Sequence, residues 1–71
     1  MDRETVLSEL RTGPIRIVMN DGTSHDVDSS EMALVDDIAA RVMFRDDKGK
    51  YRTKVLALVC MVSIEQQERA S

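Results

Sequence analysis

Several residue types that build binding and catalytic sites are scarce in this 71-residue chain. Its single cysteine excludes an internal disulfide, and with only one histidine a Cys/His zinc site within one chain is not credible. The three glycines are isolated from one another, so there is no glycine-rich loop to hold a phosphate. One Tyr, one Phe and no Trp provide no platform for stacking bases. We therefore expect a protein that is not an enzyme, with no cofactor, no small-molecule substrate, and no catalytic or metal-binding residue.

A long membrane-spanning run is also lacking. The most apolar stretch, Val55–Ile64, is interrupted only by Ser63 and is shorter than the roughly 20 residues that cross a bilayer. The charged start, Met1–Glu4, leads into no apolar signal region. These features predict a cytoplasmic protein with no membrane contact, whose apolar run is covered by the other segments.

The chain has room for one domain, with a thin core. A domain of this size buries only about 60% of the surface that its unfolded chain exposes. With disulfides and metals excluded, association with further copies is the remaining means of stabilisation. We therefore expect a homo-oligomer.

The net charge of −3 argues against a dedicated nucleic-acid binder, but it conceals a segregation of charge. Residues 17–40 contain six acidic residues and no Lys or Arg, whereas residues 41–54 contain six basic and two acidic residues, a net +4. The basic residues expected to contact nucleic acid or another subunit are Arg41, Arg45, Lys50, Arg52 and Lys54. The acidic residues expected to contact another subunit are Asp26, Asp28 and Glu31.

The N-terminal segment has the pattern of a short helix over residues 2–12. Asp2 can cap its first amides, while Gly13 and Pro14 are suited to end it. At this length the helix must dock to be stable, most simply over an open end of a sheet. Its apolar stripe consists of Val6, Leu7 and Leu10.

Residues 14–19 alternate as a strand and lead into a turn at residues 20–22. A two-residue loop would place polar side chains beside Ile15 and Ile17, whereas a three-residue loop pairs Ile17 with His25 and Ile15 with Val27. The apolar match favours the longer loop, a type I turn with Gly22 in a left-handed G1 bulge. His25 then lies on the inner face.

Residues 29–38 fit two interpretations. They match a helix capped near Ser29, or a single helical turn at 29–31 followed by a strand at 32–35 and a turn at 36–37. We favour the second, because strands surround the segment. Residues 41–45 and 51–54 alternate as strands around a loop at 46–50. The apolar run should bend or form one 3₁₀ turn near 56–58, followed by a last strand over 59–65 and a flexible polar tail, 66–71.

This order predicts a mainly β fold. A twisted antiparallel sheet of five short strands with an apolar last strand tends to close, because closure removes its edges. We expect one domain over residues 1–65, a small, strongly bent five-stranded barrel with an N-terminal helix.

The same elements resemble a set of short, uncharacterised bacterial proteins with a helix, a strand, an Asp-Gly turn and a Leu/Val-rich end. The matching residues are Met19–Gly22, Asp26–Val27, Glu31–Met32 and Ser63–Glu65. Ser29, Ser30 and Met32 stand where that set has His-Pro and Phe-like positions. The set has no assigned activity, so this resemblance implies no function.

More distantly, the helix, the strand beginning near Pro14, the polar first turn and the Val/Ile-rich end resemble Sm-like barrels, which share the small SH3-like form. That resemblance implies rings joined through edge strands, and RNA as a ligand in many members. The family's RNA-contacting Lys-His or Arg-Gly pair precedes its last strand, where this chain has Leu58–Cys60, and this departure argues against RNA binding.

Few single residues in the sequence indicate a catalytic or ligand-binding role. Cys60 lies within the apolar run and is expected to act as a small hydrophobic residue, and His25 as a half-buried, hydrogen-bonded side chain. The pairs Asp26/Asp28 and Asp36/Asp37 are expected to be solvated rather than catalytic.

Two hypotheses remain. The first is an interaction or scaffold protein that self-associates head to tail into a ring, with the acidic segment of one copy against the basic hairpin of the next. The alternative is an Sm-like RNA-binding protein that uses a basic face from Arg41 to Lys54.

Overall fold

A computed structural model describes residues 1–67 and contains one α-helix, six strands and two 3₁₀ turns. The elements, in chain order, are α1 (Arg3–Leu10), β1 (Ile15–Met19), β2 (Ser24–Val27), η1 (Ser30–Met32), β3 (Ala33–Val35), β4 (Ala39–Arg45), β5 (Tyr51–Ala57), η2 (Leu58–Cys60) and β6 (Met61–Gln66). The prediction of a mainly β fold with an N-terminal helix is confirmed. The count of five strands is wrong, because the short segment Ala33–Val35 and the segments on either side of η2 all form separate strands, which makes six within residues 1–67.

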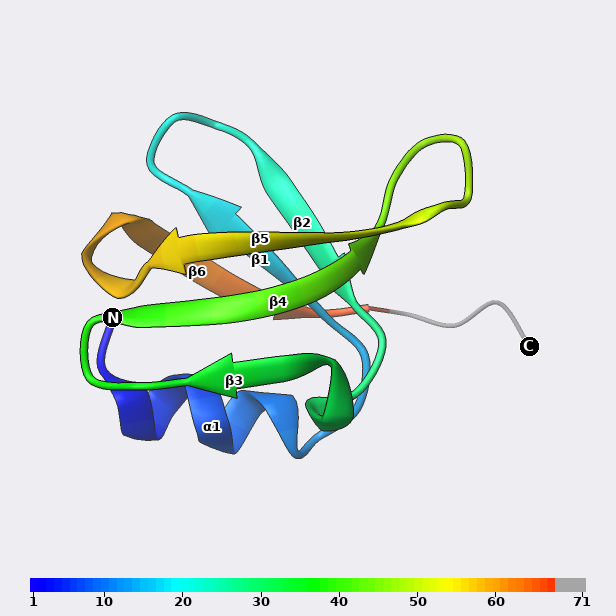
Figure 1. Ribbon diagram of the computed structural model, residues 1–71. Helices are drawn as coiled ribbons and strands as arrows, with labels where there is room; N and C mark the ends of the chain where they lie inside the picture. The colour runs from blue at the N-terminus through cyan, green and yellow to red at the C-terminus, as the bar shows by residue number, and fades with distance from the viewer. Residues whose placement is uncertain (68–71) are drawn as a thin grey trace.

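The strands form two three-stranded antiparallel sheets, with the orders β2-β1-β6 and β3-β4-β5. The chain crosses from one sheet to the other at η1 and returns at η2, and β2 contacts β4 (Figure 1). Within residues 1–67, strand pairing does not close these sheets into the expected barrel. Each sheet therefore retains two edge strands, β2 and β6 in one and β3 and β5 in the other.

The β1–β2 hairpin has the predicted register. Ile15 pairs with Val27 and Ile17 with His25, and all four side chains are buried. In the turn, the Gly22 amide donates to the Met19 carbonyl at 3.0 Å, and Gly22 has a φ of +88°. The match between apolar side chains thus determines the register, because a one-residue shift of β2 would place its polar side chains beside Ile15 and Ile17.

The second half of the chain follows the strand-turn-strand interpretation of residues 29–38, with η1 and β3 in place of a helix. The predicted bend near 56–58 occurs at Leu58–Cys60 instead, because β5 pairs with β4 as far as Ala57 opposite Ala39. At the other end, β6 includes Gln66, and the Gln67 amide donates to the Pro14 carbonyl at 3.0 Å. The remainder of the predicted tail, 68–71, lies outside the described residues.

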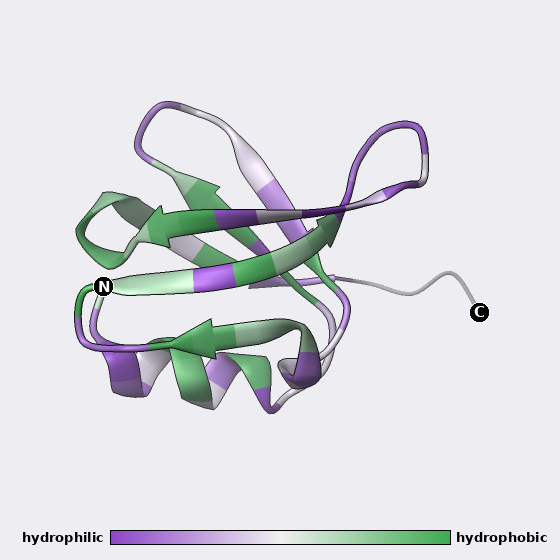
Figure 2. Ribbon diagram, viewed as in Figure 1, coloured by the Kyte–Doolittle hydropathy of each residue, from purple (hydrophilic) through white to green (hydrophobic). Residues whose placement is uncertain are grey.

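The core lies between the two sheets and α1. Within residues 1–67 it contains eleven buried apolar residues, including Ile15 and Ile17 from β1, Val42 from β4, and Val6 and Leu10 from α1. Apolar residues dominate β1, β6 and the end of β5, whereas the hairpin loops are polar (Figure 2). The Asp2 side chain accepts a hydrogen bond from the Thr5 amide at 3.1 Å and caps α1, as predicted. No helix within residues 1–67 has the length and apolar character needed to cross a membrane.

Candidate interaction surface

The free edge of β5 is the first exposed feature of this surface. β5 pairs with β4 on one side, and within residues 1–67 no strand pairs with its other side. Leu56 is the only buried residue of its seven. An unpaired strand edge presents backbone N–H and C=O groups in a row and can pair with another strand. The β6 strand forms an edge of the other sheet in the same way, and its Val62 side chain is 62% exposed.

The outer face of the β3-β4-β5 sheet is the second feature. Residues directly opposite in an antiparallel pair share a face. The pairs Leu34–Arg41 and Arg41–Val55 therefore form one row across the sheet, next to the row made by Met43 and Thr53. Leu34 is 75% and Val55 57% exposed. We call these five residues the outer face.

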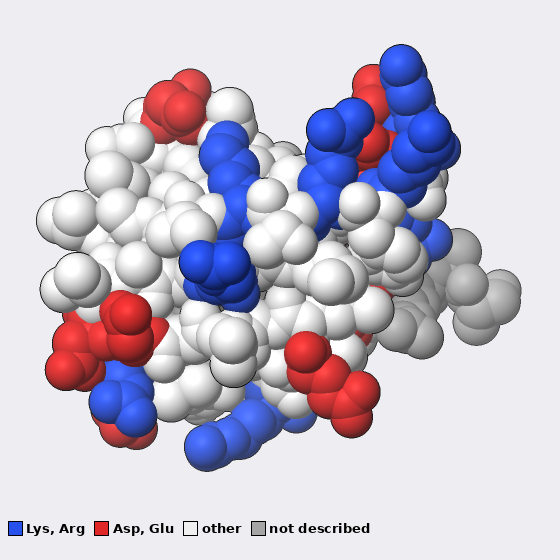
Figure 3. All heavy atoms as spheres, viewed as in Figure 1, with Lys and Arg blue, Asp and Glu red and all other residues white. Residues whose placement is uncertain are grey.

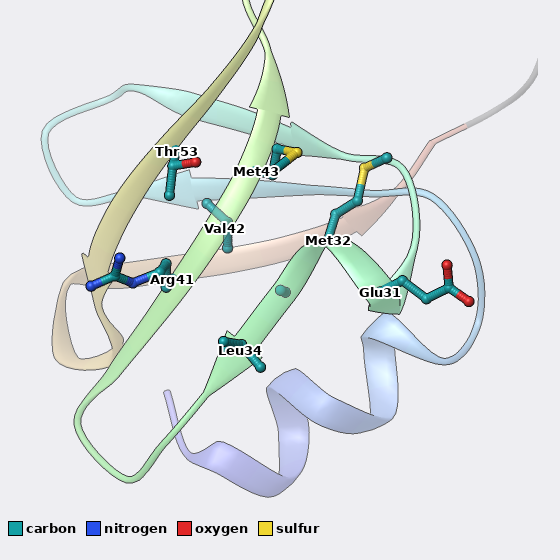
Figure 4. A pocket seen from close by; sticks show the side chains of 8 residues that line it. Glu31, Met32, Leu34, Arg41, Val42, Met43 and Thr53 are labelled. Carbon is teal, nitrogen blue, oxygen red and sulfur yellow. The ribbon is translucent and has the colours of Figure 1, made fainter.

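Two hollows of about 280 and 330 Å³ lie on the outer face. Both are lined by Leu34 and Arg41, so they lie next to each other along this row. Figure 4 shows the first, with Leu34, Met43 and Thr53 contributed by three neighbouring strands and Glu31 at its margin.

The five predicted basic contacts do not form one stripe. Arg41 and Arg45 lie on the outer face side of β4, opposite Val55 and Tyr51. Arg52 and Lys54 pair with Phe44 and Val42 and therefore lie on the opposite side of the sheet, while Lys50 is in the hairpin loop. Basic groups occupy the middle of the visible surface and the β4–β5 hairpin, with acidic groups nearby (Figure 3). The register of the hairpin thus separates charges that the sequence places within fourteen residues of one another.

Two of these bases already have acidic partners. The Arg45 guanidinium donates to Asp28 Oδ2 at 3.0 Å, and the Tyr51 hydroxyl donates to the same oxygen at 3.3 Å. Arg52 Nε donates to Asp46 Oδ2 at 2.8 Å. These hydrogen bonds raise the pKa of each guanidinium, and the Arg52 bond, together with backbone amides, lowers the pKa of Asp46.

The predicted acidic contacts are also engaged within the chain, apart from Glu31. Asp26 Oδ1 accepts from Arg16 Nε at 2.9 Å, and Asp28 accepts from Arg45. Glu31 is exposed at the edge of the first hollow. The acidic and basic halves of the sequence therefore neutralise each other in part within one copy, through Asp28 and Arg45.

His25 and Cys60, which the spacing in the sequence does not bring together, line one hollow of about 210 Å³ with Lys54. His25 is 7% exposed, packs edge-to-face on Phe44 with ring centroids 4.9 Å apart, and neither ring nitrogen has a hydrogen-bond partner within residues 1–67. The expectation of a hydrogen-bonded histidine is therefore wrong. Burial, followed by the positive charge of Lys54, lowers the pKa of His25. Cys60 is a half-buried free thiol.

Sequence reasoning missed the exposed apolar side chains. Leu34, Val55, Val59 and Val62 were all expected to help form the sheets or to be covered, yet Val59 is 85% exposed. The sequence contains little signal for Leu34 and Val55, because their exposure follows from strand pairing that sets both beside Arg41.

Comparison with models of known protein families gives no match, and no solved structure matches the fold. The function must therefore be argued from the surface itself. Within residues 1–67 no three His, Cys, Asp or Glu side chains gather where they could share a metal ion.

Proposed function

We propose that this protein is a non-enzymatic interaction module that acts in the cytoplasm and self-associates head to tail through its edge strands. The observation that carries the proposal is the free edge of β5, a seven-residue strand with one side unpaired and all residues except Leu56 exposed. Natural proteins usually shorten, cover or bend such an edge, because it can pair with another chain.

The partner edge is β6 of another copy. A contact between β5 of one copy and β6 of the next joins two different surfaces, so it is heterologous. The first and last copies of such an assembly then each keep one free edge, β6 at one end and β5 at the other. Repeating this contact around a closing rotation gives a ring. The Sm-like barrel is part of this proposal. What supports it is the chain order: η1 connects β2 of one sheet to β3 of the other, and η2 connects β5 to β6, as a strongly bent barrel would require.

Apolar side chains next to these edges favour association. Val55 on β5 and Val62 on β6 are more than half exposed, and Val59 lies on the turn between the two strands. Burying apolar surface contributes about 25 cal/mol per Å². The described residues include only eleven buried apolar side chains, so burial of further apolar surface at the edges would add to a thin core.

Charge has a smaller role than the sequence suggests. Asp26 and Asp28 already pair with Arg16 and Arg45 of the same chain, so they are not free to attract a neighbouring copy. We therefore expect assembly to depend weakly on salt, since screening acts on exposed charges rather than on backbone pairing.

Lysine substitutions on the two edges test this proposal. Val55→Lys and Val62→Lys place a charge beside each edge and should shift the mass measured by light scattering toward the 8.0 kDa of one chain. Ile38→Lys is the control, because Ile38 is an exposed apolar residue that lies in the β3–β4 turn, away from both edges. An unchanged mass in both edge variants, with wild type assembled, would exclude edge pairing.

The RNA-binding alternative has less support. Arg45 and Arg52 are paired with acids, and Arg41 lies on the opposite side of the sheet from Lys54, so the bases do not form the continuous stripe that phosphate contacts need.

A further inference from the structure

The outer face of the β3-β4-β5 sheet is a second surface, distinct from the edge contacts proposed above. Its centre, Leu34 and Arg41, lies on β3 and β4, whereas self-association is assigned to the free edges of β5 and β6; the two surfaces meet at Val55 on β5. Its chemistry therefore concerns a different partner.

Arg41 is the charged group at the centre of this face. Within residues 1–67 its side chain makes no hydrogen bond or ion pair, whereas four other arginines each pair with an aspartate. Its direct neighbours across the sheet are Leu34 and Val55. A guanidinium surrounded by apolar side chains is a good donor to a carboxylate, because a partner that covers the face also shields the ion pair from water.

The arrangement of rows indicates the shape of the partner. Ala39, Arg41 and Met43 follow one another on the outer side of β4, so their rows are about 7 Å apart. The two hollows lie next to each other at the middle row. In an extended peptide, alternate residues share a face at the same spacing of about 7 Å. A segment lying along β4 can thus place a carboxylate over Arg41 and one apolar side chain on either side.

Acidic residues at the two ends restrict what binds. Glu31 borders the first hollow and Asp36 the second. The Asp36 carboxylate accepts hydrogen bonds from the amides of Ile38 and Ala39 at 2.8 and 2.7 Å, which lower its pKa and keep it ionised. A polyanion such as RNA would meet these charges, whereas a peptide with one central carboxylate and basic ends would complement them.

We infer that the outer face binds an extended segment of a partner protein in which one acidic residue is flanked, two positions away on each side, by apolar residues. Arg41 pairs with the carboxylate, and the apolar side chains enter the two hollows beside Leu34.

The test uses a fluorescently labelled peptide, Lys-Leu-Ser-Glu-Ser-Leu-Lys, and its Glu→Gln form, measured by fluorescence anisotropy with the full chain. The Glu peptide should bind, and its affinity should fall about tenfold or more with the Gln peptide or with Arg41→Gln, as one charge-assisted hydrogen-bonded pair would cost. Leu34→Ser should also weaken binding. Lys54→Gln, a change on the other side of the sheet, should leave binding unchanged.

Three results would overturn the inference. The first is no binding of the Glu peptide, or equal binding of both peptides. The second is displacement of the peptide by a single-stranded RNA oligonucleotide whose affinity falls by similar factors in Arg41→Gln and Lys54→Gln. That result would indicate a nucleic-acid surface. The third is a change in the mass of the assembly with Arg41→Gln alone, which would show that another copy covers this face. The edge proposal would survive the first two results, because its own test is the mass of the assembly, and its variant Val62→Lys lies on β6, outside the outer face.

Discussion

Replacing His25 by Phe is predicted to stabilise the protein. The imidazole of His25 is buried against Phe44, and neither nitrogen has a partner within the described part of the chain. Burying a polar group without a hydrogen bond costs about 1–3 kcal/mol in protein mutational data. Phe retains the ring and its edge-to-face contact and removes this cost. The free energy of unfolding of His25→Phe should therefore exceed that of wild type by about 1–3 kcal/mol at pH 7.5.

The same substitution should remove a pH dependence. The pKa of His25 is lowered in the folded state, so the unfolded chain, with a histidine pKa near 6.5, takes up the proton first as the pH falls. The contribution of the neutral imidazole to the free energy of unfolding is therefore complete above a pH of about 6.5. It is lost as the pH falls below this value, at no more than about 1.4 kcal/mol per pH unit. Urea titrations from pH 7.5 to 5.5 measure this slope at one protein concentration. Leu10→Ala, which keeps the histidine and its contact with Phe44, is the control and should keep the slope. A destabilised His25→Phe variant with the wild-type slope would refute this account of the buried ring.

Two further substitutions test the fold. Gly22→Ala should destabilise the β1–β2 hairpin by about 1–2 kcal/mol, because Gly22 has a φ of +88°, at which an L-residue is strained. Asn20→Ala in the same turn should cost less. Urea titration measures both free energies of unfolding, and equal effects would contradict the assigned turn. Leu10→Ala should lower the free energy of unfolding by about 2–5 kcal/mol, because Leu10 is buried where α1 docks. Leu7 is only half-buried, so Leu7→Ala should cost less. A loss of less than about 1 kcal/mol with Leu10→Ala would show that α1 is not docked.

Local pattern was sufficient to predict much of the fold. The β1–β2 register follows from matching Ile15 and Ile17 with Val27 and His25, and the strand at Ala33–Val35 follows from its context. The position of η2 could not be predicted, because Val55–Ile64 is apolar apart from Ser63 and contains no periodic break at residues 58–60. Pairing of Ala57 with Ala39, a contact between distant segments, determines where β5 ends.

The surface was less predictable than the fold. The charge segregation is visible in the sequence, but the register that places Arg41 and Lys54 on opposite sides of the sheet depends on how β4 and β5 pair. The ion pair of Asp28 with Arg45 likewise joins residues from β4 and the segment after β2, which only the packed structure brings together.

Cross-linking between defined edges tests head-to-tail association most directly. In a Cys60→Ser background, cysteines are introduced at Val55 on β5, at Val62 on β6, or at both, and the protein is treated with a short bismaleimide. If β5 pairs with β6 of the next copy, the doubly substituted chain should give a ladder of covalent oligomers on a denaturing gel. Each single variant should stay monomeric, and an equal mixture of the two single variants should give dimers. Efficient dimers from Val55→Cys alone would instead show a two-fold contact between β5 edges and contradict the head-to-tail account.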